Sequence, residues 1–170
     1  MLIISFLSAV SIGFLALLWL TPIGVPTLKR LGAGQISPDL RFGYRPDETY
    51  RLLNLYGTLG IAHWRRMLLI DMVFPAVYAT LFVVLAMKWT AWADAGPIWR
   101  AVAIGCPILA GVSDYIENFL LLGVIKAYPR RIDASVVGAS LFTRTKFIFS
   151  YATLAIPLLY WGASRIGWPV

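Results

Sequence analysis

The chain of 170 residues is 59% hydrophobic and only 14% charged, and its formal net charge is +7 at pH 7. A soluble domain of this length carries about a quarter charged residues, so the composition excludes an ordinary soluble globular protein. The basic residues are spread over segments beside long apolar runs, which argues against a nucleic-acid-binding surface. We therefore expect anionic lipid headgroups on the cytoplasmic side of a membrane to be their partner.

The first apolar run, residues 2–20, is long enough to cross a bilayer, which takes ~20 residues. It contains no Lys or Arg and ends in Trp-Leu-Thr-Pro rather than in a small-x-small cleavage site. These features favour an uncleaved transmembrane helix over a signal peptide. Ser5, Ala9 and Gly13 share one face of this helix, and the spacing predicts close packing against another helix.

The next segment has two parts. Residues 20–40 are rich in Pro and Gly, which predicts irregular chain. Residues 47–64 then show helical periodicity, with acidic residues in the first turn that complement the helix dipole. The apolar positions recur at i, i+3, i+4 and i+7, which predicts an amphipathic helix lying at the cytoplasmic interface. These positions are Leu52, Leu55, Tyr56 and Leu59.

The only histidine, His63, continues the apolar face of this helix. A packing or interfacial role is favoured for it over a role as a ligand or acid–base group. Its near-neutral intrinsic pKa keeps the second alternative open.

Three further apolar runs, residues 67–87, 98–125 and 135–161, complete a set of four transmembrane spans. They leave no room for a separate soluble domain. The sequence therefore predicts a single all-α membrane domain over residues 1–170, a polytopic four-helix bundle with one additional amphipathic helix.

The basic residues indicate how the spans are oriented. Ten of the fifteen lie in the segments after the first and third spans, whereas three lie on the opposite side. Cytoplasmic loops carry the excess of Lys and Arg, so both termini are expected on the non-cytoplasmic side. The three on the opposite side are Lys88, Arg100 and Arg165.

Polar residues inside the last three spans form the candidate functional site. An acid at the centre of a bilayer costs ~2.5–3.5 kcal/mol, so these residues are expected to converge in the interior of the bundle. In the third span the polar residues are spaced i, i+3 and i+4, which places them on one helix face. The predicted cluster consists of Asp71 and Tyr78 in the second span, Asp114, Glu117 and Asn118 in the third, and Arg144 and Lys146 in the fourth.

Depth along the helices suggests how the charges pair. Glu117 and Arg144 lie roughly 13 and 15 Å from the cytoplasmic ends of their spans, at about 1.5 Å per residue, so we expect them to form an ion pair. Pro75 lacks an N–H and should leave the carbonyl of Asp71 free at a kink in the second span. The cluster serves either to fix helix packing or to form a functional site, and the number of ionisable groups favours function.

Several chemistries are excluded or unassigned. Cys106 stands alone, so a thiol oxidoreductase with paired cysteines is excluded, and one histidine is too few for a bis-histidine haem. His63 and Cys106 supply too few ligands for a zinc site, and no metal site is expected. Hydrolase, metalloprotease and phosphate-binding motifs are missing from the sequence. No cofactor can be assigned, and whether the protein is an enzyme stays open.

Two motifs carry a resemblance to a known group of proteins. YGTLGIAHWRRMLLIDMVFPAVYATLF and PILAGVSDYIENFLL contain a D-x-x-F-P-x-x-Y and a D-x-x-E-N pattern. They resemble an uncharacterised family of small bacterial four-span integral membrane proteins, over about two-thirds of the chain. The relatives often have Gly-Arg and Tyr where this chain has Gly60, Ile61 and Trp64. The resemblance implies a bacterial inner-membrane setting and no known activity. The matching residues are Asp71, Phe74, Pro75, Tyr78, Asp114, Glu117 and Asn118.

Three functions remain open. The first, slightly favoured because no motif demands chemistry, is an accessory or assembly subunit of a larger membrane complex, with other membrane subunits as partners. The second is a membrane enzyme or a lipid- or small-molecule-binding protein that uses a cavity at Asp71, Asp114 and Glu117. The third is a proton or ion pathway, which four helices would form only as an oligomer.

Overall fold

The structure, a computed structural model, describes residues 2–165, and over this range the chain is helical with short connections and no strand. Four helical segments, Leu2–Leu31, Pro46–Trp92, Pro97–Ala127 and Asp133–Arg165, are long and apolar enough to cross a membrane. The predicted all-α, four-span fold is therefore confirmed. In chain order the elements are α1 (Leu2–Leu20), α2 (Val25–Leu31), the 3-10 turn η1 (Pro38–Leu40), α3 (Pro46–Asp71), α4 (Phe74–Trp92), α5 (Pro97–Ala127) and α6 (Asp133–Arg165).

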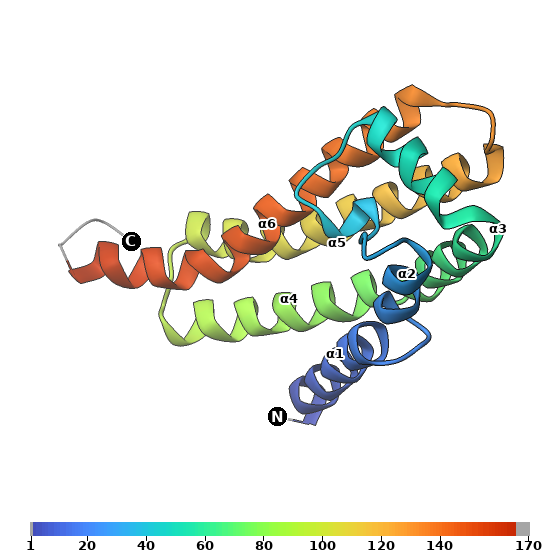
Figure 1. The fold of residues 1–170 in the computed structure, drawn as a ribbon. Coiled ribbons are helices and arrows are strands. Elements are labelled where there is room, and N and C mark those ends of the chain that lie inside the picture. Colours follow the sequence, from blue (N-terminus) through green and yellow to red (C-terminus); the bar gives the residue numbers. More distant parts are fainter. Residues whose placement is uncertain (1, 166–170) are drawn as a thin grey trace.

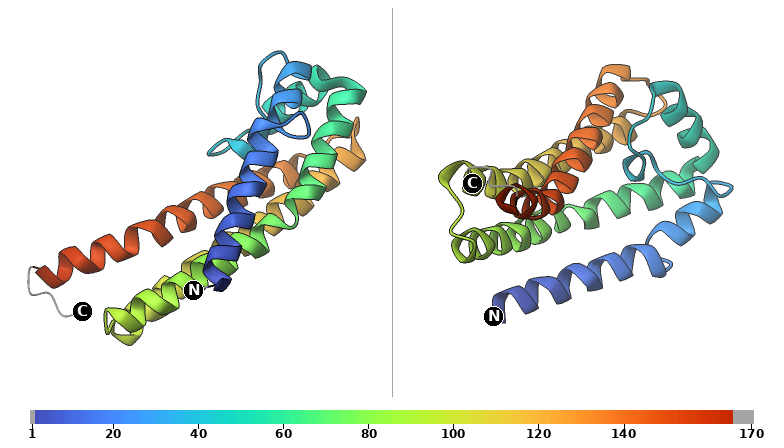
Figure 2. Two further views of the ribbon diagram at one scale, coloured as in Figure 1. Left: turned by 90° about the horizontal axis from the view of Figure 1, so that it is seen from below. Right: turned by 90° about the vertical axis from the view of Figure 1, so that its left-hand side faces the viewer.

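The long helices α4, α5 and α6 run along the molecule, with α5 packed between the other two, and α1 lies against the outer side of α4 (Figure 1). The N-terminal end of α1, the C-terminal part of α6 and the α4–α5 connection lie at one end of the molecule (Figure 2). At the other end α2, η1, the first half of α3 and the α5–α6 connection gather. This second end is called the loop end below.

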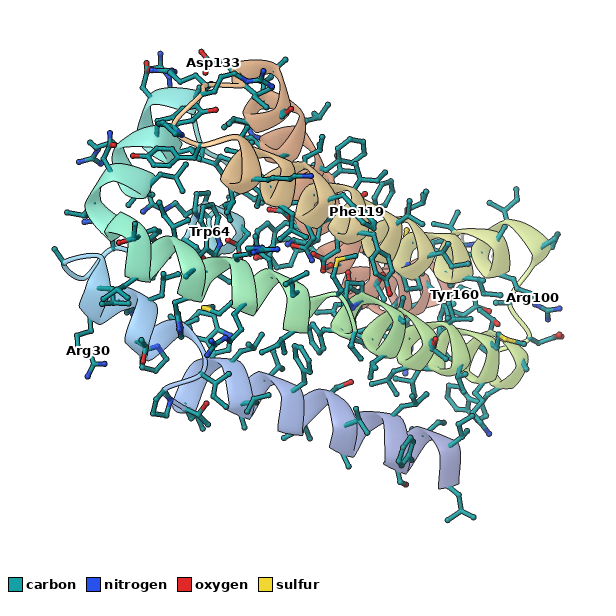
Figure 3. The ribbon with its side chains drawn as sticks, turned by 90° about the vertical axis from the view of Figure 1, so that its right-hand side faces the viewer. Arg30, Trp64, Arg100, Phe119, Asp133 and Tyr160 are labelled. Carbon is teal, nitrogen blue, oxygen red and sulfur yellow. The ribbon has the colours of Figure 1, made fainter. Side chains whose placement is uncertain are left out.

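The main hydrophobic core lies at the loop end. Side chains from α2, α3, α5 and α6 are fully buried there, whereas the opposite end has a smaller cluster around Cys106. Trp64 of α3 is 0% exposed and lies between its own helix and the loop segment (Figure 3). The apolar side chains of the other end can face lipid, so they need not be buried within the protein. The core includes Leu28, Leu53, Trp64, Leu121, Val124 and Val136.

The segment between α1 and α3 is more ordered than predicted. Instead of irregular chain throughout, it forms α2 and η1, each with a Pro in its first turn, where the missing N–H would have no helical partner. Val25 and Leu28, spaced i and i+3, bury one face of α2. His63 Nε2 lies 3.0 Å from the carbonyl oxygen of Gly24 and joins α3 to this segment, which supports its packing role.

Helix α3 begins with Pro46 as its first residue, and Glu48 Oε2 accepts a hydrogen bond from the N–H of Arg45 at 3.0 Å. The helix is interrupted at Gly57, where φ is 58° and ψ is −171°. The predicted helix over residues 47–64 is present within α3, and its position at the membrane interface stays a prediction. Leu52 is buried, whereas Leu59 is 74% exposed, and the buried residues Tyr56, Gly60 and Trp64 continue at regular spacing across Gly57. Leu55 is also exposed and Tyr56 is buried.

The second span contains a break at the predicted kink, within the helical stretch Pro46–Trp92. Helix α3 ends at Asp71, residues 72 and 73 form a turn, and α4 starts at Phe74 with Pro75 in its first turn. Pro75 has no N–H to donate to the carbonyl of Asp71, so the helix is interrupted there. The break places Asp71 at the inner end of α3.

The face of small residues on α1 is exposed in the described part of the chain. Ser5, Ala9 and Gly13 are all exposed, so the expectation of close helix packing there is wrong for residues 2–165. The helix contacts α4 through another face instead. Phe14 stacks on Phe74 with ring centroids 4.8 Å apart.

Candidate functional site

The polar face of α5 forms the centre of the candidate site. Asp114, Glu117 and Asn118 are 4%, 0% and 1% exposed, and they share one side of the helix as their spacing predicts. This side faces α4 and α6, the two helices that pack most closely on α5. The carboxylates are thus shielded from lipid by protein, as an intramembrane charge requires.

Lys146 of α6 pairs with this face. Its Nζ lies 2.6 Å from Glu117 Oε2 and 3.1 Å from Asp114 Oδ1. The Lys146 side chain is only 15% exposed. One ammonium group therefore neutralises two adjacent carboxylates, which keeps them from standing unpaired in a low-dielectric interior.

Arg144 does not belong to the cluster, so the predicted Glu117–Arg144 ion pair is wrong. Arg144 is exposed, and its guanidinium lies against the backbone of Gly43 at the loop end. The reason is helical geometry. Thr143 and Lys146, spaced i and i+3, face α5, whereas Arg144 is rotated by about 100° from Thr143. Similar depth in the membrane was not sufficient to predict a contact.

The second oxygen of Glu117 is bound by residues that the sequence did not single out. Thr143 Oγ1 donates to Glu117 Oε1 at 2.5 Å, and it also lies 3.2 Å from the hydroxyl of Tyr44. The backbone N–H of Tyr44 donates to Ser140 Oγ at 2.9 Å. Burial, followed by the nearby Glu117 carboxylate, raises the pKa of Tyr44, so its hydroxyl stays protonated. The chain between η1 and α3 therefore covers this carboxylate.

Asp71 and Tyr78 reach the same cluster from the second span. Asn118 Nδ2 donates to Asp71 Oδ2 at 2.9 Å, and the Tyr78 hydroxyl donates to Asp114 Oδ2 at 3.1 Å. The structure therefore brings together all the predicted cluster residues except Arg144. Asp71 reaches the cluster because it is the last residue of α3, at the break before α4, and lies beside α5 there.

A fourth carboxylate, Asp39 of η1, was missed. The indole N–H of Trp64 donates to Asp39 Oδ1 at 3.0 Å. Burial raises the pKa of Asp39, while Lys146 and hydrogen bonds from Ser37 and Trp64 oppose this rise. The only sequence signal was an acid within a Pro- and Gly-rich segment, which is ordinarily a solvated turn.

These groups line a cavity of about 390 Å³. Its walls are apolar and come mainly from α1, α3, α4 and α6, and its polar floor comes from η1, α3, α4, α5 and α6. Pockets of about 300–1,000 Å³ with apolar walls and a few convergent polar groups are typical ligand sites. The wall residues include Leu15, Leu18, Phe74, Phe82, Phe147 and Leu154, and the floor is formed by Asp39, Asp71, Tyr78, Asp114 and Lys146.

The charges around this cavity do not balance. Four carboxylates, three of them on the floor, face one ammonium group, and Lys146 is already bound to Glu117 and Asp114. Asp39 and Asp71 have hydrogen-bond donors but no ion pair with any residue in the range 2–165. Within the same range no three His, Cys, Asp or Glu side chains are grouped so as to hold a metal ion. The arrangement is suited to a cationic or hydrogen-bond-donating group from outside the protein.

No protein-family model, curated protein or solved structure matches this chain. The resemblance to small bacterial four-span proteins therefore stays a prediction that rests on the two motifs.

Proposed function

We propose that the protein binds amphipathic molecules from the membrane in the cavity between α1, α4 and α6, with a cationic head against the acidic floor. The observation that carries this proposal is the combination of apolar walls with an excess of carboxylates in one cavity. A cluster that served only to fix helix packing would need balanced pairs, because each unpaired buried charge is destabilising. Asp39 and Asp71 are the two carboxylates available to a ligand.

The route into the cavity supports a membrane-borne ligand. α1 packs on α4 and α6 packs on α5, so the two helices lie apart (Figure 2). Both contribute side chains to the lining of the cavity. The wall side chains are hydrocarbon or aromatic over most of its depth. An alkyl chain can therefore occupy the outer part while its head reaches the floor, which favours a lipid-like molecule over a polar metabolite.

The proposal is tested with a series of twelve-carbon ligands that differ only in the head. Dodecylamine, dodecanol and dodecanoic acid are added to the protein in mild detergent, and binding is followed by native mass spectrometry and thermal unfolding. We expect dodecylamine to bind most tightly and to raise the unfolding temperature most. Asp71→Asn should remove this preference, because it deletes a floor carboxylate while keeping the acceptor oxygen that faces Asn118.

Asp94→Asn is the matched control, since Asp94 is exposed in the α4–α5 connection and the charge change is the same. Equal affinity for the three ligands, or a preference for dodecylamine that remains in Asp71→Asn, would contradict the proposal.

For the cellular setting we infer the bacterial cytoplasmic membrane, with the loop end in the cytoplasm and both termini outside. The supporting observation is that the fold gathers the two Lys- and Arg-rich segments at the loop end (Figures 1 and 2). Cytoplasmic loops carry this excess.

An accessory subunit of a larger membrane complex stays a second candidate. The observation that favours it is the exposed face of small residues on α1, since small residues permit close approach of a helix from another chain. Native mass spectrometry of the protein extracted in mild detergent distinguishes the two. A stoichiometric protein partner supports the subunit, and a bound small molecule supports the cavity function.

A further inference from the structure

A second hollow of about 880 Å³ lies between α3 and the last turns of α5 and shares no lining residue with the acidic cavity. It is a groove whose base is built from small residues, because an added Cβ at Gly57 or Gly123 would meet no atom within 4 Å. At the loop end the groove is bounded by Tyr128, whose hydroxyl donates to Asn54 Oδ1 across the two helices. None of the side chains lining it is acidic. They are Gly57, Thr58, Ile61, Ala62, Arg65, Leu69, Leu122, Gly123, Ile125, Lys126 and Tyr128.

Two cations line this groove from opposite helices. Arg65 comes from α3 and Lys126 from α5, and both are exposed. Neither forms a hydrogen bond or an ion pair with another residue in the range 2–165. This contrasts with Arg131, which at the same end of the molecule binds both Asp47 and Asp133. The Arg65 and Lys126 charges are therefore free to bind an anion.

The rest of the groove is apolar. Leu69 is 51% exposed, and with Leu122 it continues the groove away from the loop end, towards the membrane-spanning parts of the two helices. A soluble anion such as free phosphate would use the two cations and leave these side chains unused. A phospholipid would use both parts, because its headgroup phosphate lies where the acyl chains begin. Basic pockets between transmembrane helices on the cytoplasmic side are typical sites of this kind.

We propose that the groove between α3 and α5 is a binding site for an anionic phospholipid, with its headgroup between Arg65 and Lys126 and an acyl chain along Leu69 and Leu122. This site is separate from the acidic cavity in position and opposite to it in charge. Its ligand would therefore differ from the ligand of that cavity, and either proposal can fail without the other.

The test measures lipid binding to the purified full chain in mild detergent. Phosphatidylglycerol and phosphatidylcholine of equal chain length are titrated in, with inorganic phosphate as a third arm, and bound lipid is counted by native mass spectrometry. We expect phosphatidylglycerol to bind selectively. The double variant Arg65→Gln with Lys126→Gln should weaken this binding about 10- to 30-fold, and the loss should shrink at high salt. Inorganic phosphate should not compete at concentrations near that of the lipid.

Two further variants separate the groove from general surface charge. Arg66→Gln with Arg130→Gln removes the same charge from two exposed residues outside the groove, and selectivity should remain. Gly123→Leu fills the groove without touching either cation, and binding should fall although the net charge is unchanged. The proposal is overturned if the control pair loses as much affinity as the groove pair, if Gly123→Leu binds normally, or if phosphate alone displaces the lipid.

Discussion

Lys146 Nζ lies 2.6 Å from Glu117 Oε2, and this pair is the closest ionic contact between two membrane helices of the bundle in the described range 2–165. The same ammonium group lies 3.1 Å from Asp114, one helical turn earlier on α5. Lysine suits this position because its flexible stem and three donors allow one charge to serve two carboxylates. The contact joins α5 to α6 at the level of the acidic cavity.

Removal of Lys146 should therefore be strongly destabilising. Lys146→Met leaves two carboxylates buried without a counter-charge, which typically costs ~3–5 kcal/mol when one partner of a buried pair is lost. Adding Glu117→Leu to Lys146→Met should recover part of this loss, because it removes the buried charge as well. The free energy of unfolding in mild detergent measures both effects.

Arg144→Gln is the control for this pair, since Arg144 is exposed two positions away on the same helix. It should change the free energy of unfolding by no more than ~0.5 kcal/mol, as is usual for surface substitutions. A loss from Arg144→Gln as large as that from Lys146→Met would show that the ionic contact is with Arg144 instead.

Gly57 should tolerate no other residue without cost. Its φ of 58° with ψ of −171° lies in a region that is almost restricted to glycine, so Gly57→Ala should destabilise the protein by ~1–3 kcal/mol. Gly105→Ala is the control, because Gly105 lies within α5 and its added Cβ would meet no atom within 4 Å. It should be neutral or stabilising by up to ~1 kcal/mol. Thermal unfolding compares the two, and a harmless Gly57→Ala would argue against the break in α3.

The membrane spans and the buried face of α5 could be predicted because each depends on a local pattern. Apolar length defines a span, and Asp114, Glu117 and Asn118 share a face by spacing alone. The choice of Lys146 over Arg144 could not be predicted in this way. It depends on the rotation of α6 about its axis, which packing of Thr143 against α5 sets, whereas depth along the helix is nearly the same for both residues.

Asp39 escaped prediction for a different reason. Its partner Trp64 lies 25 positions away, and the contact forms only because η1 folds back over α3. A Pro- and Gly-rich segment gives no periodic signal from which such a return could be inferred. Gly57 shows the converse case. The glycine was visible in the amphipathic segment, but only the backbone angles show that the helix is interrupted there.

The raised pKa of Asp39 gives stability a defined pH dependence. Its ordinary pKa is 3.8, and burial raises the pKa in the folded state, so the unfolded chain loses its proton first as pH rises. The group therefore destabilises the fold progressively as pH increases from about 4 through the folded-state pKa, and its penalty is then constant. Asp39→Asn removes this titration and keeps an acceptor oxygen for Trp64. The variant should match the wild type near pH 4 and become relatively more stable at higher pH.

The quantity to measure is the difference in the free energy of unfolding between Asp39→Asn and the wild type. Chemical unfolding in detergent at several pH values gives this difference. Asp71, Asp114 and Lys146 line the same cavity and are present in both proteins, so the difference reports on Asp39. A difference that is constant from pH 4 to pH 8 would contradict a raised pKa for Asp39. A difference of opposite sign would show that Asp39 is stabilised as a carboxylate by Lys146.

The orientation of the bundle can be tested with two single cysteines in a Cys106→Ala background. Asp94 lies in the α4–α5 connection and Gln35 lies at the loop end, and both side chains are exposed. Because the Lys- and Arg-rich segments gather at the loop end, that end is expected in the cytoplasm. A membrane-impermeant maleimide added to intact cells should therefore label Asp94→Cys and spare Gln35→Cys until the membrane is permeabilised. The reverse pattern would place the termini inside, and it would also move Arg65 and Lys126 to the outer leaflet, where the anionic lipid proposed for their groove would have to be found.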